Sequence, residues 1–209
     1  GFEGLGSGPA RALVAEEEEY QRMGYRDASD FAVLAIESDE LPTEAVAEHV
    51  ADRAGVPASG VFLPTFSTAS ITGSVALAAR GGELAAFRLS ELGYDPLDML
   101  TATGSAPVAP VPDTDDVAMA RTNDALAYGA RVHMTVDEPF ERFDEVASTA
   151  GETFGTPFEA IFEEHDWDFY ELPVDVFAPA HVTFDVVGGG VEVAGRTDDS
   201  MLAGSFGLR

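Results

Sequence analysis

The feature that most limits the possible folds is a short apolar run followed by a capped helix and a second apolar run. Residues 31–36 (FAVLAI) are continuously apolar, over a length typical of a buried strand. Residues 44–54 are then predicted to be a helix, because Thr43 stands where a cap is favoured and Gly55 where a helix ends. Residues 61–63 form a second short apolar run. The order strand, helix, strand predicts α/β layering.

The rest of the chain alternates predicted helices and strands, with strands gathered near the end. Residues 182–187 and 191–194 are typical of strands, and Gly188-Gly189-Gly190 between them indicates a hairpin. From apolar spacing and Gly or Pro boundaries, we expect helices at residues 10–23, 75–92, 116–121, 138–150 and 157–164, and strands at 132–136 and 174–177. Residues 101–116, which contain several Pro and Asp, are the best linker candidate. We therefore expect a mixed α/β (α+β) fold, with one α/β part over residues 1–110 and a second, β-rich at its end, over residues 111–209.

Acidic residues greatly outnumber basic ones. Asp and Glu total 38 against 11 basic residues, all of them Arg, so the formal net charge is −27. Such a surface repels itself in dilute buffer, whereas in molar salt the Debye length of about 3 Å screens the repulsion. Apolar residues make up 45% of the chain, which is enough to form a core. We predict adaptation to high salt; the alternative is an ordinary acidic protein.

The same composition excludes several classes of partner. Nucleic-acid binding needs a basic face, which eleven scattered Arg residues do not make. No stretch approaches the about 18 continuous apolar residues of a membrane span, and no signal-peptide pattern opens the chain. We therefore expect a cytoplasmic protein that binds neither nucleic acid nor membranes.

A metal site is not expected from the sequence. There is no Cys, so thiolate ligands are absent. The four His residues, at positions 49, 133, 165 and 181, form no H-E-x-x-H arrangement. We predict no metal and no cofactor of that kind.

The N-terminal segment is rich in glycine ahead of a predicted helix. Gly4, Gly6 and Gly8 precede Pro9, and Arg11 falls in the first helical turn. A flexible turn is one interpretation. The other is a backbone that approaches a ligand closely, with Arg11 binding a carboxylate or phosphate, because an Arg at this end of a helix opposes the dipole.

Arg80 and Glu83 are three residues apart, which places them on one face of a helix. A surface ion pair is the more common outcome of such spacing. The alternative is a partly buried carboxylate that the Arg holds ionised and oriented, which suits a water-activating base. Val75 and Leu84 nearby favour burial, and Gly81-Gly82 would leave room for a ligand.

A polar cluster, Arg121-Thr122-Asn123-Asp124, precedes an apolar segment. It could cap the next element through side chain to backbone hydrogen bonds. It could equally supply donors and acceptors to a heterocycle, for which Asn and Asp are well suited. The residues alone leave both interpretations open.

Several stretches together resemble the methenyl-tetrahydromethanopterin cyclohydrolase family. In the family's order, they are residues 6–13 (GSGPARAL), 63–65 (LPT), 70–75 (SITGSV), 79–83 (ARGGE), 106–110 (APVAP), 121–125 (RTNDA), 128–129 (YG) and 177–180 (FAPA). Each stretch is weak alone, whereas the ordered set is specific. Gly81-Gly82 departs from the bulkier apolar residues expected between the Arg and the Glu.

The resemblance implies an activity and an architecture. Members hydrolyse the methenyl bridge of a reduced pterin to the formyl-pterin in one-carbon metabolism, without a metal or prosthetic group. They form homotrimers whose subunits have two α/β domains with a cleft between them. They also carry an N-terminal part that we expect to be missing here. The alternatives are the same reaction on methenyltetrahydrofolate, or a pterin-binding module without turnover.

The resemblance also implies site residues. Glu83 is the expected base and Arg80 the residue that sets its ionisation and orientation, with Asp124 as the next candidate base. The expected substrate-binding residues are Ser7, Pro9, Arg11, Thr65, Arg121, Thr122, Asn123, Asp124 and Tyr128.

Overall fold

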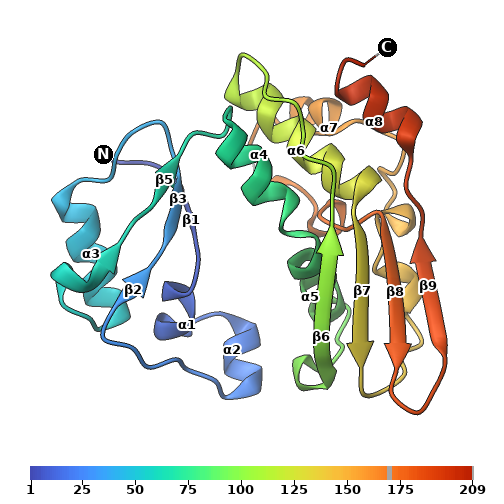
Figure 1. The fold of residues 1–209 in the computed structure, drawn as a ribbon, viewed down its shortest axis with the longest axis horizontal. Helices are drawn as coiled ribbons and strands as arrows, with labels where there is room; N and C mark the ends of the chain where they lie inside the picture. The colour runs from blue at the N-terminus through green and yellow to red at the C-terminus, as the bar shows by residue number, and fades with distance from the viewer. Residues whose placement is uncertain (169–170, 209) are drawn as a thin grey trace. The chain divides into compact units, whose positions relative to one another are not determined.

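A computed structural model describes residues 1–168 and 171–208 and has the mixed α/β fold that the sequence predicts (Figure 1). The chain divides into two compact units, residues 1–73 and residues 74–209. The sequence placed the division at residue 110 instead. The difference arises because the strand that begins at Met99 pairs with the sheet of the second unit, which draws residues 74–110 into that unit.

The first unit contains two small sheets. Their strands are β1 (Leu5–Ser7), β2 (Ala32–Val33), β3 (Ala35–Glu37), β4 (Val61–Phe62) and β5 (Thr65–Phe66). The strand orders are β1-β3-β5 and β2-β4; β3 is parallel to β5, and β2 is parallel to β4. The helix α3 (Glu44–Ala54) connects the two parallel runs. The predicted strand–helix–strand unit is therefore present, with the run 31–36 divided between β2 and β3.

The predicted helix over residues 10–23 is broken in two. α1 (Ala10–Val14) ends at Ala15, which adopts a left-handed conformation with φ of 54° and donates its N–H to the Arg11 carbonyl. α2 (Glu18–Met23) begins three residues later and ends at Gly24, as the sequence predicts. A left-handed alanine cannot be expected from local preference, because its Cβ disfavours that conformation.

The second unit is built on a four-stranded sheet of order β6-β7-β8-β9. Its strands are β6 (Met99–Ser105), β7 (Arg131–Val136), β8 (His181–Val186) and β9 (Val191–Gly195). β7 is parallel to β8, and the two outer pairs are antiparallel. The β8–β9 pairing confirms the hairpin predicted at the three glycines.

Within the described residues, five helices accompany this sheet, whose strands β7 and β8 alternate buried residues with exposed or partly exposed ones, so that helices do not enclose both faces. They are α4 (Ile71–Ala78), which crosses from the first unit, α5 (Gly81–Glu91), α6 (Asp115–Gly129), α7 (Phe158–Glu164) and α8 (Asp199–Ser205). Figure 1 shows α5 beside β6, with α6, α7 and α8 gathered at one end of the strands. The core between α5 and the sheet includes Leu89, Met134 and Phe184, and Phe143 stacks on Phe184 with ring centroids 4.1 Å apart.

Five further predicted elements differ from the structure. The helix expected at 75–92 is divided between α4, which ends at Ala78, and α5, which begins at Gly81. The linker expected at 101–116 begins inside β6, whose exposed edge position gives no apolar alternation. The helix expected at 116–121 extends from Asp115 to Gly129. The sequence did not predict its second half because nearly all of those residues are buried, so polar and apolar positions do not alternate with the period of a helix. The segments 138–150 and 174–177 form only short 3-10 turns, at residues 143–145, 148–150 and 174–176, rather than a helix and a strand.

Candidate active site

Arg80 and Glu83 form a two-armed ion pair at the start of α5. Arg80 is the residue before the helix and Glu83 lies in its first turn. Arg80 Nε donates to Glu83 Oε2 and Nη2 donates to Oε1, both at 2.9 Å. An acidic residue in the first turn is also favoured by the helix dipole. Both carboxylate oxygens are thus oriented by one planar guanidinium.

The exposure of the pair fits the surface ion pair that the spacing favoured, rather than the partly buried carboxylate that was the alternative. The Arg80 and Glu83 side chains are 40% and 47% exposed. Val75, which was expected to cover the pair, is itself 51% exposed, whereas Leu84 is buried. Exposed pairs of this kind contribute about 0–1 kcal/mol to stability. What remains is an oriented carboxylate that water can reach, and such a group can accept a proton.

The two glycines between Arg80 and Glu83 lie against the sheet. A Cβ on Gly81 would lie 3.5 Å from Val132 Cγ2, and one on Gly82 would lie 3.6 Å from Ala102 Cβ. These are ordinary contact distances, so packing alone does not require glycine at either position. That the two glycines leave room for a ligand stays a prediction.

The glycine-rich segment of the first unit leads into a short helix. Ser7 ends β1, and Pro9 precedes α1. Arg11 Nη1 donates to Ser7 Oγ at 3.1 Å, while Nε and Nη2 bind the Glu17 carboxylate at 2.8 and 2.5 Å. The unfavourable placement of Arg11 near a helix start is thus offset by Glu17. Gly8 adopts φ of 148°, and an added Cβ would lie 3.0 Å from the Val33 carbonyl, so close strand packing accounts for this glycine.

Thr65 begins β5, close to the carboxylate of Glu37, which the sequence did not single out as a candidate. Thr65 Oγ1 donates to the Leu63 carbonyl at 3.0 Å. Glu37, the last residue of β3, accepts a 2.6 Å hydrogen bond from Thr68 Oγ1. Ligands of α/β sheets bind at the carboxyl ends of parallel strands, where Glu37 and Thr68 lie. The available signal was an acidic residue directly after the apolar run 31–36.

The polar cluster of residues 121–124 lies inside α6 and caps nothing at its start. Thr122 Oγ1 donates to the Ala118 carbonyl at 2.9 Å, and Asn123 Nδ2 donates to the Met119 carbonyl at 2.9 Å. Arg121 Nε donates to the Ser205 carbonyl at 3.0 Å, which ties α6 to α8. The cap interpretation is therefore wrong, because the helix begins six residues earlier, at Asp115.

Asp124 joins three helices. Its side chain is buried, with Oδ1 accepting from the Phe158 N–H at the start of α7 at 3.0 Å and Oδ2 accepting from Ser205 Oγ in α8 at 2.6 Å. Burial raises the pKa of Asp124 from 3.8 to about 6, although the two hydrogen bonds act in the opposite direction. Asp124 therefore takes up a proton at a higher pH than an ordinary Asp does, near pH 6.

Tyr128, one turn after Asp124, makes a similar internal contact. Its O–H donates to the Thr156 carbonyl at 2.7 Å and accepts from the Gly155 N–H at 3.1 Å. Burial raises the pKa of the Tyr128 phenol, so the hydroxyl stays protonated. Tyr128 thus anchors the loop that leads into α7.

The predicted site residues fall in separate places. Ser7 contacts Arg11 in the first unit, where Pro9 and Thr65 also lie. Arg80 contacts Glu83 at the start of α5, and the remaining predicted residues share α6 in the second unit.

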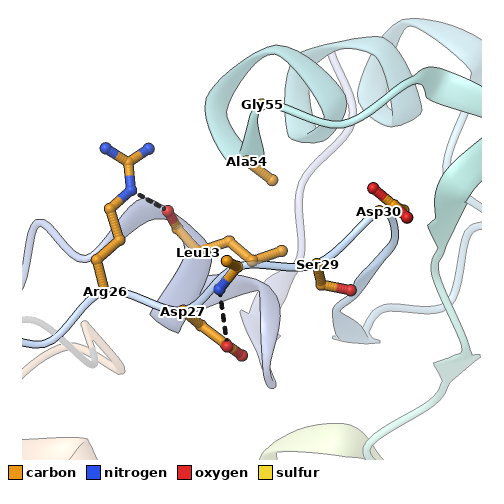
Figure 2. Close-up of a pocket in the computed structure, with 8 residues that line it drawn as sticks. Leu13, Arg26, Asp27, Ser29, Asp30, Ala54 and Gly55 are labelled. Atoms are coloured by element: carbon orange, nitrogen blue, oxygen red, sulfur yellow. Dashed lines mark hydrogen bonds between the residues drawn. The ribbon is translucent and has the colours of Figure 1, made fainter.

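A hollow in the first unit contains none of the predicted site residues (Figure 2). Its volume is about 450 Å³, and its lining is Leu13, Arg26, Asp27, Ala28, Ser29, Asp30, Ala54 and Gly55. Figure 2 shows Arg26 Nε donating to the Leu13 carbonyl, at 2.9 Å. The hollow is open and polar, and its lining residues do not suggest a particular reaction or ligand.

The described parts of the chain contain neither a metal-binding cluster nor a membrane-spanning helix. Within residues 1–168 and 171–208, no group of three or more His, Asp or Glu side chains is placed to hold a metal ion. No helix in the same residues is long and apolar enough to cross a membrane.

Comparison with known proteins places the chain in a family. The family described as Cyclohydrolase (MCH) matches residues 1–206. The chain belongs to this family. The resemblance drawn from the eight short stretches is thereby confirmed, over nearly the whole chain.

Named members of the cyclohydrolase family are similar throughout. A methenyltetrahydromethanopterin cyclohydrolase of Halobacterium salinarum is 55% identical over 207 residues, covering 99% of this chain and 67% of the relative. The enzymes of the same name from Methanocella arvoryzae and Methanothermobacter thermautotrophicus are 39% and 37% identical, covering 100% and 99% of this chain and 67% of each relative. The chain thus spans about two thirds of the length of these relatives.

Proposed function

We propose that this protein hydrolyses 5,10-methenyltetrahydromethanopterin to 5-formyltetrahydromethanopterin, a hydrolase reaction at a cyclic amidine C–N bond. The observation that carries the proposal is the family match over residues 1–206, together with an oriented, accessible carboxylate at Glu83. No bound metal or prosthetic group is required, because the substrate carbon is already electrophilic.

The reaction needs a positioned water and a proton acceptor. The methenyl carbon lies in a cationic amidine between two nitrogens. Water oxygen bonds to that carbon and loses a proton to the Glu83 carboxylate. The C–N10 bond then breaks with its electron pair going to N10, which takes a proton, while the new hydroxyl gives up its own proton and becomes the carbonyl of the formyl group on N5. Overall, the cation and one water give the neutral formyl-pterin and one proton. General base action contributes about 10²–10⁴-fold to such a step.

Arg80 orients this base. Its two hydrogen bonds, both 2.9 Å, fix the plane of the Glu83 carboxylate. Positioning of water against the substrate carbon supplies several further kcal/mol, on the order of those measured for intramolecular reactions.

The proposed substrate-binding residues divide by burial. Ser7, Pro9, Arg11, Thr65 and Arg121 are exposed or partly exposed and are proposed to bind the pterin or its tail. Thr122, Asn123, Asp124 and Tyr128 are buried among protein partners. We propose that Asp124 and Tyr128 contribute to the site by tying α6 to α7, α8 and the loop before α7. Thr122 and Asn123 donate to carbonyls of α6 itself and are proposed to stabilise that helix.

The carrier and the setting remain part of the proposal. Tetrahydrofolate shares the reacting bridge and differs in its tail, so it is the alternative carrier, and a pterin-binding module without turnover is the alternative function. We further propose that the protein forms a homotrimer and works in a cytoplasm of high salt. We also propose that its reaction is related to those of methanogenesis. The net charge of −27 supports the high-salt setting.

The test is spectroscopic. The conjugated methenyl-pterin absorbs at a longer wavelength than the formyl product, so turnover is followed as a loss of absorbance. The full chain would be assayed with both carriers, from dilute buffer to molar KCl. Decay with the methanopterin carrier is the expected result. Binding without decay at every salt concentration would establish the binding module instead, and equal rates with both carriers would show that the tail is not recognised.

A further inference from the structure

The first turn of α5 lies unusually close to the edge strand β6. Gly104 of β6 stands opposite Val132 of β7, and a Cβ added to Gly104 would lie only 3.2 Å from the backbone nitrogen of Gly82. The same atom would lie 3.4 Å from Val132 Cγ2 and 3.5 Å from the Arg131 carbonyl. Carbon atoms in van der Waals contact normally stay about 3.5–4.0 Å apart, so a methyl group here would be crowded and a neighbour would have to move by a few tenths of an ångström.

The three glycines of this contact differ in what a side chain would meet. At Gly81 and Gly82 the nearest atoms are side-chain methyl groups at ordinary contact distance, 3.5 and 3.6 Å. At Gly104 the nearest atom belongs to the backbone of α5 itself. A methyl group there cannot be accommodated by a rotamer change, so the strand or the helix start must shift.

The amide that Gly104 approaches belongs to the segment that holds the ion pair. Gly82 lies between Arg80 and Glu83, in the turn that sets the direction of both side chains. A shift of this turn by a few tenths of an ångström moves the carboxylate relative to anything bound beside it. Catalytic geometry is sensitive on this scale, since a displacement of about 1 Å can cost on the order of 10²-fold in rate.

We infer that Gly104 is a positioning residue, which by its lack of a side chain keeps the first turn of α5 seated against β6 and so fixes the Arg80–Glu83 pair. The inference rests on the proposed function for its catalytic consequence. Glycine is otherwise unfavourable in a strand, by about 0.5–1 kcal/mol relative to Ala, so local preference does not explain it.

The test is Gly104→Ala in the full chain, with Gly190→Ala as the matched control. Gly190 lies in the β8–β9 hairpin of the same sheet, with no atom within 4 Å of an added Cβ. For Gly104→Ala we expect kcat to fall about 3- to 30-fold with KM changed less than about twofold, while Gly190→Ala stays at the wild-type rate. Both kinetic constants of Gly104→Ala within twofold of wild type would overturn the inference.

A second variant separates positioning from simple crowding. Val132→Ala removes the side-chain contact at 3.4 Å and leaves the backbone contact at 3.2 Å in place. Adding Gly104→Ala to the Val132→Ala protein should therefore lower kcat by the same factor as Gly104→Ala does in the wild type. Restored turnover in the double variant would show that crowding of Val132 was the cause, and the inference would be wrong.

A readout without turnover keeps this inference apart from the proposed function. In ¹⁵N-labelled protein, Gly104→Ala should shift the amide signals of Gly82 and Glu83, whereas Gly190→Ala should not. If the wild type shows no turnover, the proposed function fails and the amide signals alone decide the inference. Unchanged Gly82 and Glu83 signals would contradict it in either case.

Discussion

Two polar groups in the second unit contain similar residues and differ in what surrounds them. At the start of α5, Arg80 binds Glu83 with both partners nearly half exposed. In the interior of α6, Asp124 is 2% exposed and binds the backbone of α7 and the hydroxyl of Ser205 in α8. The sequence marked both as candidate sites. The contrast shows that residue type indicates which chemistry is possible, while burial decides whether a group is open to solvent or holds helices together.

A second ion pair sharpens the comparison. Arg142 and Glu145 have the same three-residue spacing, form two hydrogen bonds of 2.8 and 2.7 Å, and are 46% and 45% exposed. Here Arg142 lowers the pKa of the Glu145 carboxyl, chiefly through the hydrogen bond. Glu145 is therefore a matched control for Glu83, with the same local geometry at a different place in the unit.

The largest expected effect is loss of turnover in Glu83→Gln. The amide keeps the shape of the side chain and cannot accept the proton, so kcat should fall by about 10²–10⁴ with little change in KM. Glu145→Gln should leave both constants near wild type. If Glu83→Gln keeps most of its turnover in high salt, Glu83 is not the base and Asp124 becomes the candidate.

The next effect is on stability and concerns Asp124. The pKa of Asp124 is raised in the folded state, from 3.8 to about 6, so its protonated form stabilises the fold below pH 3.8 and that stability is lost as pH rises through about 6. Asp124→Asn does not titrate. The unfolding free energy of wild type minus that of the variant should therefore fall by on the order of 3 kcal/mol between pH 3.8 and pH 7.

That difference is measured by urea unfolding of both proteins in molar KCl, where the titration of all other carboxylates cancels. A difference that does not change with pH would show that Asp124 titrates normally. A large loss of kcat in folded Asp124→Asn would move this residue from the structural group to the catalytic one.

A smaller effect is expected for Arg80→Lys. Lysine keeps the charge and loses the planar two-armed geometry, so kcat should fall by about tenfold or less. In the double variant with Glu83→Gln the two losses should not add, because Arg80 acts through Glu83. Additive losses would assign Arg80 a separate role.

The smallest effect is expected for Tyr128→Phe. Loss of the hydroxyl leaves the Thr156 carbonyl and the Gly155 N–H without this partner, which should lower the unfolding free energy by about 1–2 kcal/mol. Turnover of the folded protein should stay within twofold of wild type. A KM raised tenfold with unchanged stability would instead show that Tyr128 contacts the substrate.

Local signals predicted the elements that depend on near neighbours. The helix over 44–54 follows from its cap and glycine stop, the hairpin from its three glycines, and the Arg80–Glu83 contact from a spacing of three residues. Each of these features depends on interactions between residues close together in the chain, so the local sequence is enough to predict it. The family could be recognised from eight short stretches in the right order, because such a match depends on the sequence alone and not on the three-dimensional structure.

Other features depend on atoms distant in the chain and became visible only in the folded protein. β6 exists as a strand because β7 pairs with it, although its own residues alternate weakly. Asp124 is buried because α7 and α8 pack over it, 34 and 81 residues away in sequence at its two hydrogen-bond partners. Gly104 faces Gly82 for the same reason. Burial and close backbone approach are properties of packing between segments, and no local pattern specifies which distant segment will arrive.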